Sequence, residues 1–221
     1  MRVEARTDNH EGLSETLRRE GHSRRFRRGQ ALFTEGDRAE RVFLIDSGWV
    51  MISCMSAEGR EIVLGLRGSG DIIGELSTLD GEARSATAQA VAEVDAIVAS
   101  GAVLTQALER PDAARELIGV LATRLRDADR KRLQFATLDT LGRVAERLLE
   151  LSERFGQPTA DGVAVEMPFS QEQLASWCGA SREATVKALA ALRSLHCIST
   201  GRQSLVIHDM VALRGHAQRR A

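Results

Sequence analysis

The sequence contains few of the residues that build metal centres and disulfide frameworks. Its 221 residues include three cysteines, far apart and with no Cys-x-x-Cys pair: Cys54, Cys178 and Cys197. The sequence therefore supports neither a disulfide framework nor a zinc knuckle. The five histidines show no ligand spacing, and residues 25–100 contain none. A metal-dependent oxygenase needs two or three histidines and a carboxylate, so we predict no metal site, no catalytic residue and no enzyme.

Charge of one sign and long apolar runs are also missing. Lys and Arg number 30 and Asp and Glu 31, a formal net charge of -1, so any nucleic-acid surface must be local. No apolar run approaches the roughly 20 residues that a membrane helix needs, and residues 1–20 lack the apolar segment of a signal peptide. With 43% hydrophobic and 28% charged residues, we expect a folded cytoplasmic protein without a membrane partner.

Glycine divides the chain at Pro111. Twelve of the 19 glycines precede this residue. Short apolar runs separated by glycine-containing turns lie at 41–45, 49–53 and 61–64. Strands at this spacing are typical of an antiparallel sandwich or barrel. A short charged helix is expected before them, at about 12–20.

A long helix is predicted from Pro111, because proline suits the first turn and an acid follows it at the positive end of the helix dipole. Seven positions then recur at alternating spacings of four and three: Ala114, Ile118, Leu121, Leu125, Ala128, Arg132 and Phe135. This heptad seam suits pairing with a second copy of the chain. The alternative is a helix that packs on its own β domain. A second amphipathic helix is expected at 140–155, and a loop at 156–162.

Two short helices separated by a glycine turn are predicted near the C-terminus. Ser170 is a good N-cap, with Gln173 at the reciprocal capping position, and Ser181 caps a second helix after Gly179. Helix, tight turn and helix over about 24 residues is typical of a DNA-reading module. The second helix is expected to bury three apolar residues: Val186, Leu189 and Leu192.

Charged residues near the start of that second helix are the candidates for contacts with bases. They are Arg182, Glu183 and Lys187. An arginine can donate two hydrogen bonds to guanine, and a glutamate can accept one from cytosine. Residues 181–220 carry seven basic and two acidic residues, a net charge of +5, which leaves -6 for the rest of the chain. A strand pair turning at Gly201 would form a wing whose Arg202 reaches a phosphate.

A phosphate cassette is predicted within residues 70–88. Residues 74–77 can form a short helical turn whose amides converge, and Arg84, at the start of the next strand, supplies a two-pronged donor beside the Ser85 hydroxyl. Glu75 would repel a phosphate alone but suits an adjoining sugar hydroxyl. This pair of charges therefore indicates a nucleotide. The alternative is a solvated salt bridge.

The order of these motifs resembles the cyclic-AMP receptor protein/fumarate-nitrate regulator superfamily of bacterial transcription factors. The motifs are Gly-Asp-x-x-Gly-Glu-Leu, then Arg-Ser-Ala, a long helix, and Ser-Arg-Glu on a recognition helix. The resemblance implies an α+β protein in three parts: an N-terminal antiparallel β jelly roll of the cyclic-nucleotide-binding type at 1–110, a dimerisation helix and hinge at 111–139, and a winged helix-turn-helix at 140–221.

The resemblance also assigns residues to roles. The effector-binding set is Gly74, Glu75, Leu76, Arg84, Ser85, Ala86 and Asp129. The DNA-binding set is Ser170, Gln171, Ser181, Arg182, Glu183, Lys187 and Arg202. Members that bind cyclic AMP place a threonine, then serine or asparagine, where this chain has Ala128 and Asp129. Alanine cannot form a hydrogen bond with the base, so we expect Asp129 to accept one from an adenine amine or a guanine edge. Recognition of the phosphate and ribose is expected to be retained.

We therefore predict a homodimeric regulator that binds a palindromic site in double-stranded DNA, with half-sites like TGTGA, and acts on RNA polymerase. Its effector is expected to be a cyclic nucleotide such as cyclic AMP, with no other cofactor. The alternative is a regulator of the same family that is constitutive or answers another signal. The missing N-terminal cysteine cluster disfavours the iron-sulfur branch, whereas His22 leaves a haem branch open. A nucleotide-gated scaffold that acts through protein contacts also stays open.

Overall fold

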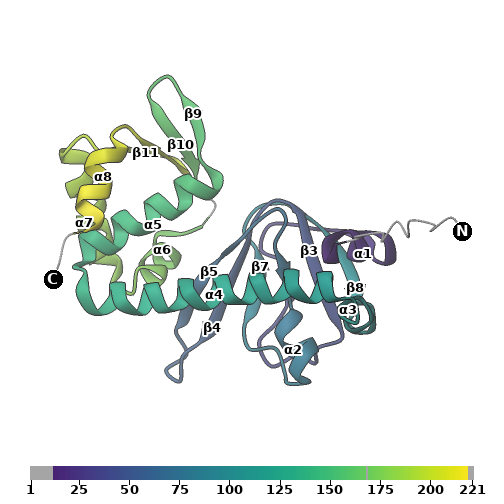
Figure 1. Cartoon of the computed structure of the whole chain (residues 1–221). Coiled ribbons are helices and arrows are strands. Elements are labelled where there is room, and N and C mark those ends of the chain that lie inside the picture. Colours follow the sequence, from purple (N-terminus) through teal and green to yellow (C-terminus); the bar gives the residue numbers. More distant parts are fainter. Residues whose placement is uncertain (1–11, 168, 219–221) are drawn as a thin grey trace, which may run out of the picture. The chain divides into compact units, whose positions relative to one another are not determined.

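The computed structural model describes residues 12–167 and 169–218 (Figure 1). The chain divides into two compact units. Unit 1 comprises Met1–Val50 and Leu66–Leu125, and unit 2 comprises Met51–Gly65 and Arg126–Ala221. The boundary falls inside the longest helix. The division into parts at 110 and 139 stays a prediction.

The β-rich half contains two sheets, each four-stranded within residues 12–167. The first sheet has the order β1-β8-β3-β6 and the second β2-β7-β4-β5. Their strands are β1 (His22–Phe26), β2 (Ala31–Phe33), β3 (Arg41–Ser47), β4 (Val50–Met55), β5 (Glu61–Arg67), β6 (Ile72–Ile73), β7 (Thr87–Ala90) and β8 (Val94–Ser100). The ladders of β8 with β1 and β3, of β3 with β6, and of β2 with β7 are antiparallel. The expected antiparallel β domain is confirmed.

Three aromatic rings hold the sheets of unit 1 together. Phe43 on β3 lies with its ring centroid 6.1 Å from Phe26 on β1 and 5.7 Å from Phe33 on β2. Phe26 and Phe43 are buried. Since β2 belongs to the second sheet, these contacts join the two sheets. Removing such apolar rings from water favours folding through the hydrophobic effect.

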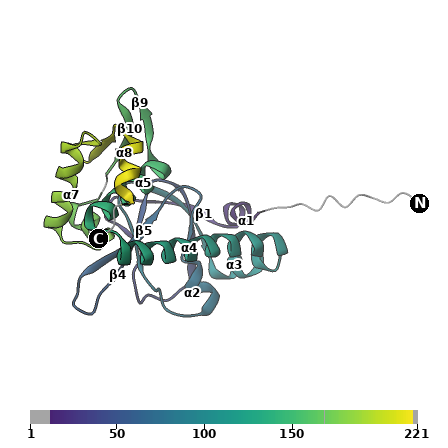
Figure 2. The same cartoon turned by 60° about the vertical axis from the view of Figure 1, so that its left-hand side comes forward.

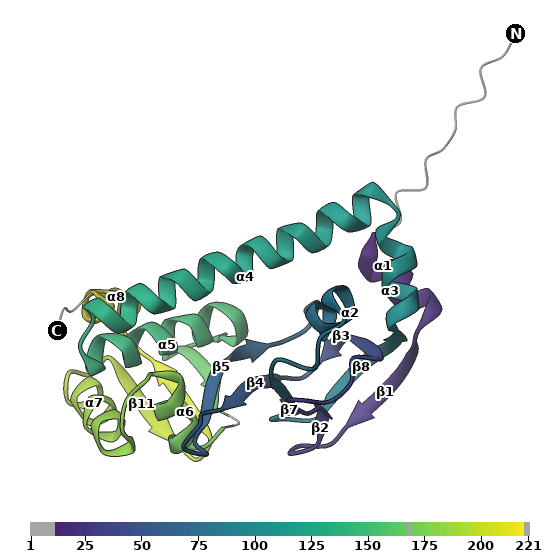
Figure 3. The same ribbon diagram turned by 90° about the horizontal axis from the view of Figure 1, so that it is seen from below.

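Helices cover one end of this β domain. The expected helix at 12–20 is confirmed as α1 (Leu13–Glu20), and α3 (Gly101–Leu108) lies beside it (Figure 3). Leu13 and Leu17 pack with Leu104 on α3 and with Leu117 on the following helix. The helix α3 was not predicted, because residues 101–108 carry no charged residue to mark an exposed face.

The predicted long helix is confirmed as α4 (Pro111–Thr137), and its two faces differ. Ala113 and Leu117 are buried in the core of unit 1, whereas Ile118, Leu125 and Leu133 are exposed. One face of α4 thus packs on unit 1, and another face exposes apolar side chains within the described chain. The next helix, α5 (Thr140–Phe155), has the predicted bounds, and Asp139 caps it by accepting from the Gly142 N–H at 2.7 Å.

The rest of unit 2 combines short helices with a sheet of order β11-β12-β10-β9 (Figure 2). Its elements are β9 (Gln157–Thr159), β10 (Gly162–Glu166), α6 (Gln171–Trp177), α7 (Arg182–Ser194), β11 (Ile198–Gly201), β12 (Ser204–Ile207) and α8 (Met210–Ala217). The expected loop at 156–162 was wrong, because β9 pairs there with β10. Pro158 is tolerated since β9 is an edge strand. The helix α8 was also missed.

Candidate functional site

The cassette in unit 1 begins where α2 (Glu75–Asp80) starts, as the sequence predicted. Gly74 precedes it with φ +79°, and a Cβ there would lie 2.8 Å from Nη1 of Arg84. Only glycine allows this backbone conformation and this close approach together. Glu75, the first residue of α2, is 3% exposed.

Arg84 lies in this cassette but does not begin a strand, because β7 starts at Thr87. The backbone of Arg84 pairs instead with the segment 36–37: its N–H donates to Asp37 O and its carbonyl accepts from the Gly36 N–H, both at 2.9 Å. This pair of bonds replaces the regular ladder and explains why the strand prediction was wrong at this residue.

The Arg84 guanidinium is 4% exposed and is held by backbone carbonyls. Nη1 donates to Gly74 O at 2.6 Å and Nη2 to Arg41 O, while the guanidinium carbon lies 4.4 Å above the ring centroid of Phe33. Nε is buried without a hydrogen-bond partner. Burial lowers the pKa of Arg84, and the charges of Glu75 and Asp37 oppose that shift. The result is a buried cation with donor capacity left over.

The Glu75 carboxylate is neutralised by Arg124, a residue of α4 that the sequence analysis missed. Arg124 Nη1 donates to Glu75 Oε1 at 2.6 Å, and Nη2 donates to Ile72 O at 2.5 Å. A second carboxylate, Asp71, lies 3.9 Å from Nη2. The only sequence signal was the place of Arg124, one turn before Ala128. The contact connects the cassette directly to the long helix.

The remaining effector candidates differ in how the structure places them. Ser85 and Leu76 are exposed and Ala86 is buried. Asp129 belongs to unit 2, where it is exposed and pairs with Arg132 at 3.4 Å. The structure thus brings Gly74, Glu75 and Arg84 together.

The two predicted helices of the DNA-reading module have the expected caps. Ser170 Oγ accepts from the Gln173 N–H at 3.1 Å, and the Gln173 side chain accepts from the Ser170 N–H at 2.9 Å. Ser181 Oγ accepts from the Ala184 N–H at 3.2 Å. Gly179 makes the turn with φ +59°, where a Cβ would lie 2.7 Å from the ring of Phe135. Caps and turn therefore follow the local sequence.

The start of α7 presents the charged residues to solvent, since Arg182, Glu183 and Lys187 are all exposed. Hydrogen bonds from its own backbone N–H and from Ser181 hold the pKa of Glu183 below its ordinary value. The carboxylate therefore stays ionised and able to accept a hydrogen bond at neutral pH. We call these three residues, with Val186, the reading face.

Val186 corrects the sequence analysis. We expected it to be buried, but it is 38% exposed, and Thr185 and Ala188 are buried with Leu189 and Leu192. The buried stripe is shifted by one residue, because packing inside unit 2 selects the face. Val186 follows Arg182 by one turn and is a further candidate for base contact, since an apolar side chain suits a thymine methyl group.

Other DNA-binding candidates surround the reading face. Ser170 and Gln171 are exposed at the start of α6. Arg202 is exposed in the turn between β11 and β12, so the predicted wing is present. The basic residues Arg219 and Arg220, part of the predicted net charge of +5, lie outside the described residues.

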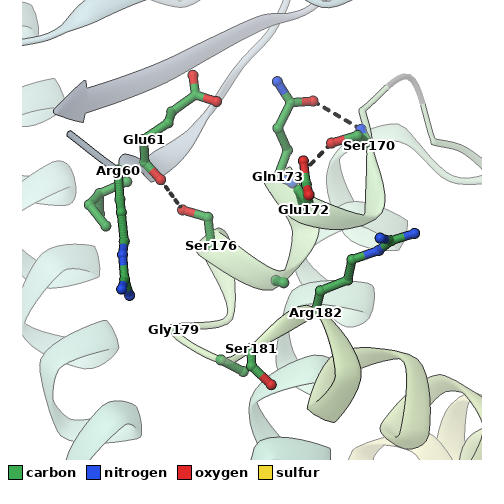
Figure 4. Close-up of a pocket in the computed structure, with 12 residues that line it drawn as sticks. Arg60, Glu61, Ser170, Glu172, Gln173, Ser176, Gly179, Ser181 and Arg182 are labelled. Carbon is green, nitrogen blue, oxygen red and sulfur yellow. Dashed lines mark hydrogen bonds between the residues drawn. The ribbon is translucent and has the colours of Figure 1, made fainter. Parts of the chain in front are cut away.

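A cavity of about 790 Å³ within unit 2 adjoins these residues. Ser170, Ser181 and Arg182 line it together with Arg60 and Glu61 of the β4–β5 hairpin (Figure 4). Figure 4 shows that the Ser176 hydroxyl on α6 donates a hydrogen bond to the backbone carbonyl of Glu61 in the hairpin. The hairpin thus contacts α6 beside the turn of the reading module.

Comparison with known proteins matches both parts of the chain. Residues 23–111 match the model of the cyclic nucleotide-binding domain, and residues 142–215 match the Crp-like helix-turn-helix domain. The CRP-like cAMP-activated global transcriptional regulator of Mycobacterium tuberculosis (strain CDC 1551 / Oshkosh) is 35% identical over 194 residues, covering 87% of each chain. The chain belongs to the CRP-like family of transcription regulators.

Three other proteins that are similar to this chain have different names. The global nitrogen regulator of Synechococcus elongatus is 30% identical over 85% of this chain and 86% of its own. The c-di-GMP responsive global regulator CLP of Xanthomonas campestris has a TM-score of 0.74 at 28% identity, covering 89% of this chain and 98% of that one. FixK2 of Bradyrhizobium japonicum shares the fold, with a TM-score of 0.79 at 22% identity over 88% and 96% of the two chains.

Membership of the CRP-like family decides the class of function. The protein is a transcription regulator with a cyclic nucleotide-binding domain and a helix-turn-helix domain, and this family consists of regulators rather than enzymes. The described residues include no helix with the length and apolar character needed to cross a membrane.

Proposed function

We propose that this regulator binds a cyclic nucleotide in the cassette and reads a palindromic DNA site as a homodimer. The observation that supports the effector best is the buried Arg84 guanidinium, which makes no ion pair within the described part of the chain and keeps an unpartnered Nε. A buried cation in this state is stabilised by an anion that supplies oxygen acceptors. A cyclic phosphate with an adjoining ribose fits the acid and base of this cassette.

The proposed binding step changes partners inside the cassette. The phosphate accepts from Arg84 and from the exposed Ser85 hydroxyl, and a ribose hydroxyl donates to Glu75. Glu75 then shares its negative charge between the ribose and Arg124, whose side chain belongs to α4. Ligand binding therefore biases the state of α4 and of the break between α4 and α5, at Leu138 and Asp139, as a population shift.

Cyclic AMP is the first candidate for the effector, because it activates the relative from Mycobacterium tuberculosis. Ala128 offers no hydrogen bond to a base, so base recognition is assigned to Asp129. A second candidate function is regulation without a cyclic nucleotide. The ion pair between Glu75 and Arg124 favours it, because the carboxylate already has a partner without a ligand.

The homodimer is proposed to form along α4. Ile118, Leu125 and Phe135 of the predicted seam are exposed apolar residues on this helix, and Leu121 is half-buried. A second copy would bury this seam by heptad packing. Two recognition helices about 34 Å apart would then read successive major grooves. We place this activity in the cytoplasm, with RNA polymerase as the further partner.

Titration calorimetry with cyclic AMP and cyclic GMP tests the effector. We expect heat with at least one nucleotide and tighter binding of a palindromic duplex in its presence. Absence of heat with both, while DNA binding persists, would favour the second candidate function.

Sedimentation of the full chain tests the dimer. We expect a dimer for the native sequence and a monomer for Leu125→Glu, which places a charge in the seam. The exposed Arg115→Glu on the same helix is the matched control. A native chain that sediments as a monomer and still binds the palindrome would contradict the proposed dimer.

A further inference from the structure

Within residues 12–167 and 169–218, the β4–β5 hairpin has an edge without a strand partner. In the sheet order β2-β7-β4-β5, strand β5 is terminal. One row of its backbone N–H and C=O groups therefore faces no neighbouring strand, and such groups need other partners when they are removed from water. Val63 in the middle of β5 is buried.

A side chain of α6 takes the place of that missing strand. Ser176 Oγ accepts from the Val63 N–H at 2.9 Å and donates to Glu61 O at 2.8 Å. One serine hydroxyl thus satisfies both a donor and an acceptor of the same strand, as a paired strand would do. All of these residues belong to unit 2.

The contact holds α6 without covering the reading face. Ser176 lies in the last turn of α6, just before the Gly179 turn that leads into α7. Of the reading face, only Arg182 lines the cavity beside the hairpin (Figure 4), and it stays exposed there. The hairpin therefore supports the first helix of the module while the charged start of the second stays open to DNA.

We propose that Ser176 is a positioning residue for DNA recognition, which acts by fixing α6 to the edge of β5. This inference rests on the proposed DNA-binding function. The hairpin continues covalently into unit 1 at both ends, Val50–Met51 and Gly65–Leu66. Within unit 2, the hydroxyl thus orients α6, the helix that leads through the Gly179 turn into α7.

Ser176→Ala removes both hydrogen bonds and leaves the helix intact, since alanine is the best helix former. We expect palindrome binding, measured by fluorescence anisotropy, to weaken about tenfold. Ser176→Thr keeps the hydroxyl and should restore that affinity. Ser194→Ala is the matched control, because its hydroxyl bonds only to Ala190 O of its own helix.

Hydrogen exchange at the Val63 amide reports the contact without DNA. We expect this amide to exchange faster in Ser176→Ala, while amides of β8 keep their protection. Unchanged exchange at Val63 overturns the proposal, as does native palindrome affinity in a folded Ser176→Ala protein. If the native chain binds no palindrome while Val63 exchange still responds to Ser176, the DNA-binding function fails and the hairpin contact stands.

Discussion

The cassette of unit 1 and the reading face of unit 2 hold their charged groups in opposite ways. Glu75 and Arg84 are almost fully buried; Glu75 pairs with Arg124, and two of the three guanidinium nitrogens of Arg84 donate to backbone carbonyls, with Nε left unpartnered. Arg182 and Lys187 are exposed. A ligand in the cassette must exchange partners with existing contacts, whereas DNA meets side chains that are already free to bind. The first arrangement suits a switch, and the second suits a reader on a fixed scaffold.

The largest expected effect comes from the reading face. Arg182→Ala should weaken binding of the palindromic duplex by about 30-fold to about 20,000-fold, because each lost bidentate contact costs roughly 1–3 kcal/mol and a dimer has two. Gel shifts or anisotropy with the full chain measure this. Arg193→Ala, at the other end of α7 and bonded to Thr200, is the control. Equal affinity in the two variants would refute the reading face.

A single substitution in the cassette should reduce ligand affinity less than Arg182→Ala reduces DNA affinity. Arg84→Gln is expected to weaken cyclic-nucleotide binding by about 10-fold to 100-fold, since charge-assisted bonds contribute about 1.5–3 kcal/mol. DNA affinity without nucleotide should stay the same, because the reading face lies in the other unit. Calorimetry and gel shifts check the two halves of this prediction. The exposed Arg38→Ala serves as control, and native affinity in Arg84→Gln would contradict the assignment.

Arg124 tests whether buried charges in unit 1 depend on each other. Arg124→Ala leaves the buried Glu75 carboxylate without this hydrogen-bonded partner, so the free energy of unfolding should fall by about 2 kcal/mol. Glu75→Gln in the same chain should recover part of that loss, because it removes the unpaired charge. Urea unfolding measures both variants. Arg132→Ala, which breaks an exposed ion pair on the same helix, should cost no more than about 0.5 kcal/mol.

The smallest effect concerns the scaffold beneath the reading face. Burial raises the pKa of the Cys178 thiol to about 12, from an ordinary value of 9.0. The unfolded chain therefore releases this proton at lower pH than the folded one, and stability should fall as pH rises from 9 to 12. The expected slope is about 1.4 kcal/mol per pH unit. Urea unfolding at pH 8 and pH 10 should show this extra loss in the native chain. If Cys178→Ala loses as much unfolding free energy between pH 8 and pH 10 as the native chain, the buried thiol is not the cause of the loss.

Local signals in the sequence predicted much of both regions. Pro111, Ser170 and Ser181 mark helix starts that the structure confirms, because the signals at a helix start come from residues within the first turn. The position of β9 was not predicted, since Pro158 reads as a breaker until its strand is known to lie at an edge.

Contacts between distant residues could not be predicted in the same way. Arg124 lies 49 residues from Glu75, and an isolated arginine on a charged helix looks like a solvated side chain. Val186 was assigned to the wrong face of α7, because helical spacing allows neighbouring stripes and only packing selects one.

The sequence by itself determined the order of the elements, their caps and the residue types offered for an anion and for DNA. Each of these depends on interactions between near neighbours or on composition. Only the tertiary structure decided which charges are neutralised and which stay free, because the desolvation of a charge and the distance to its partner depend on segments that are far apart in the chain.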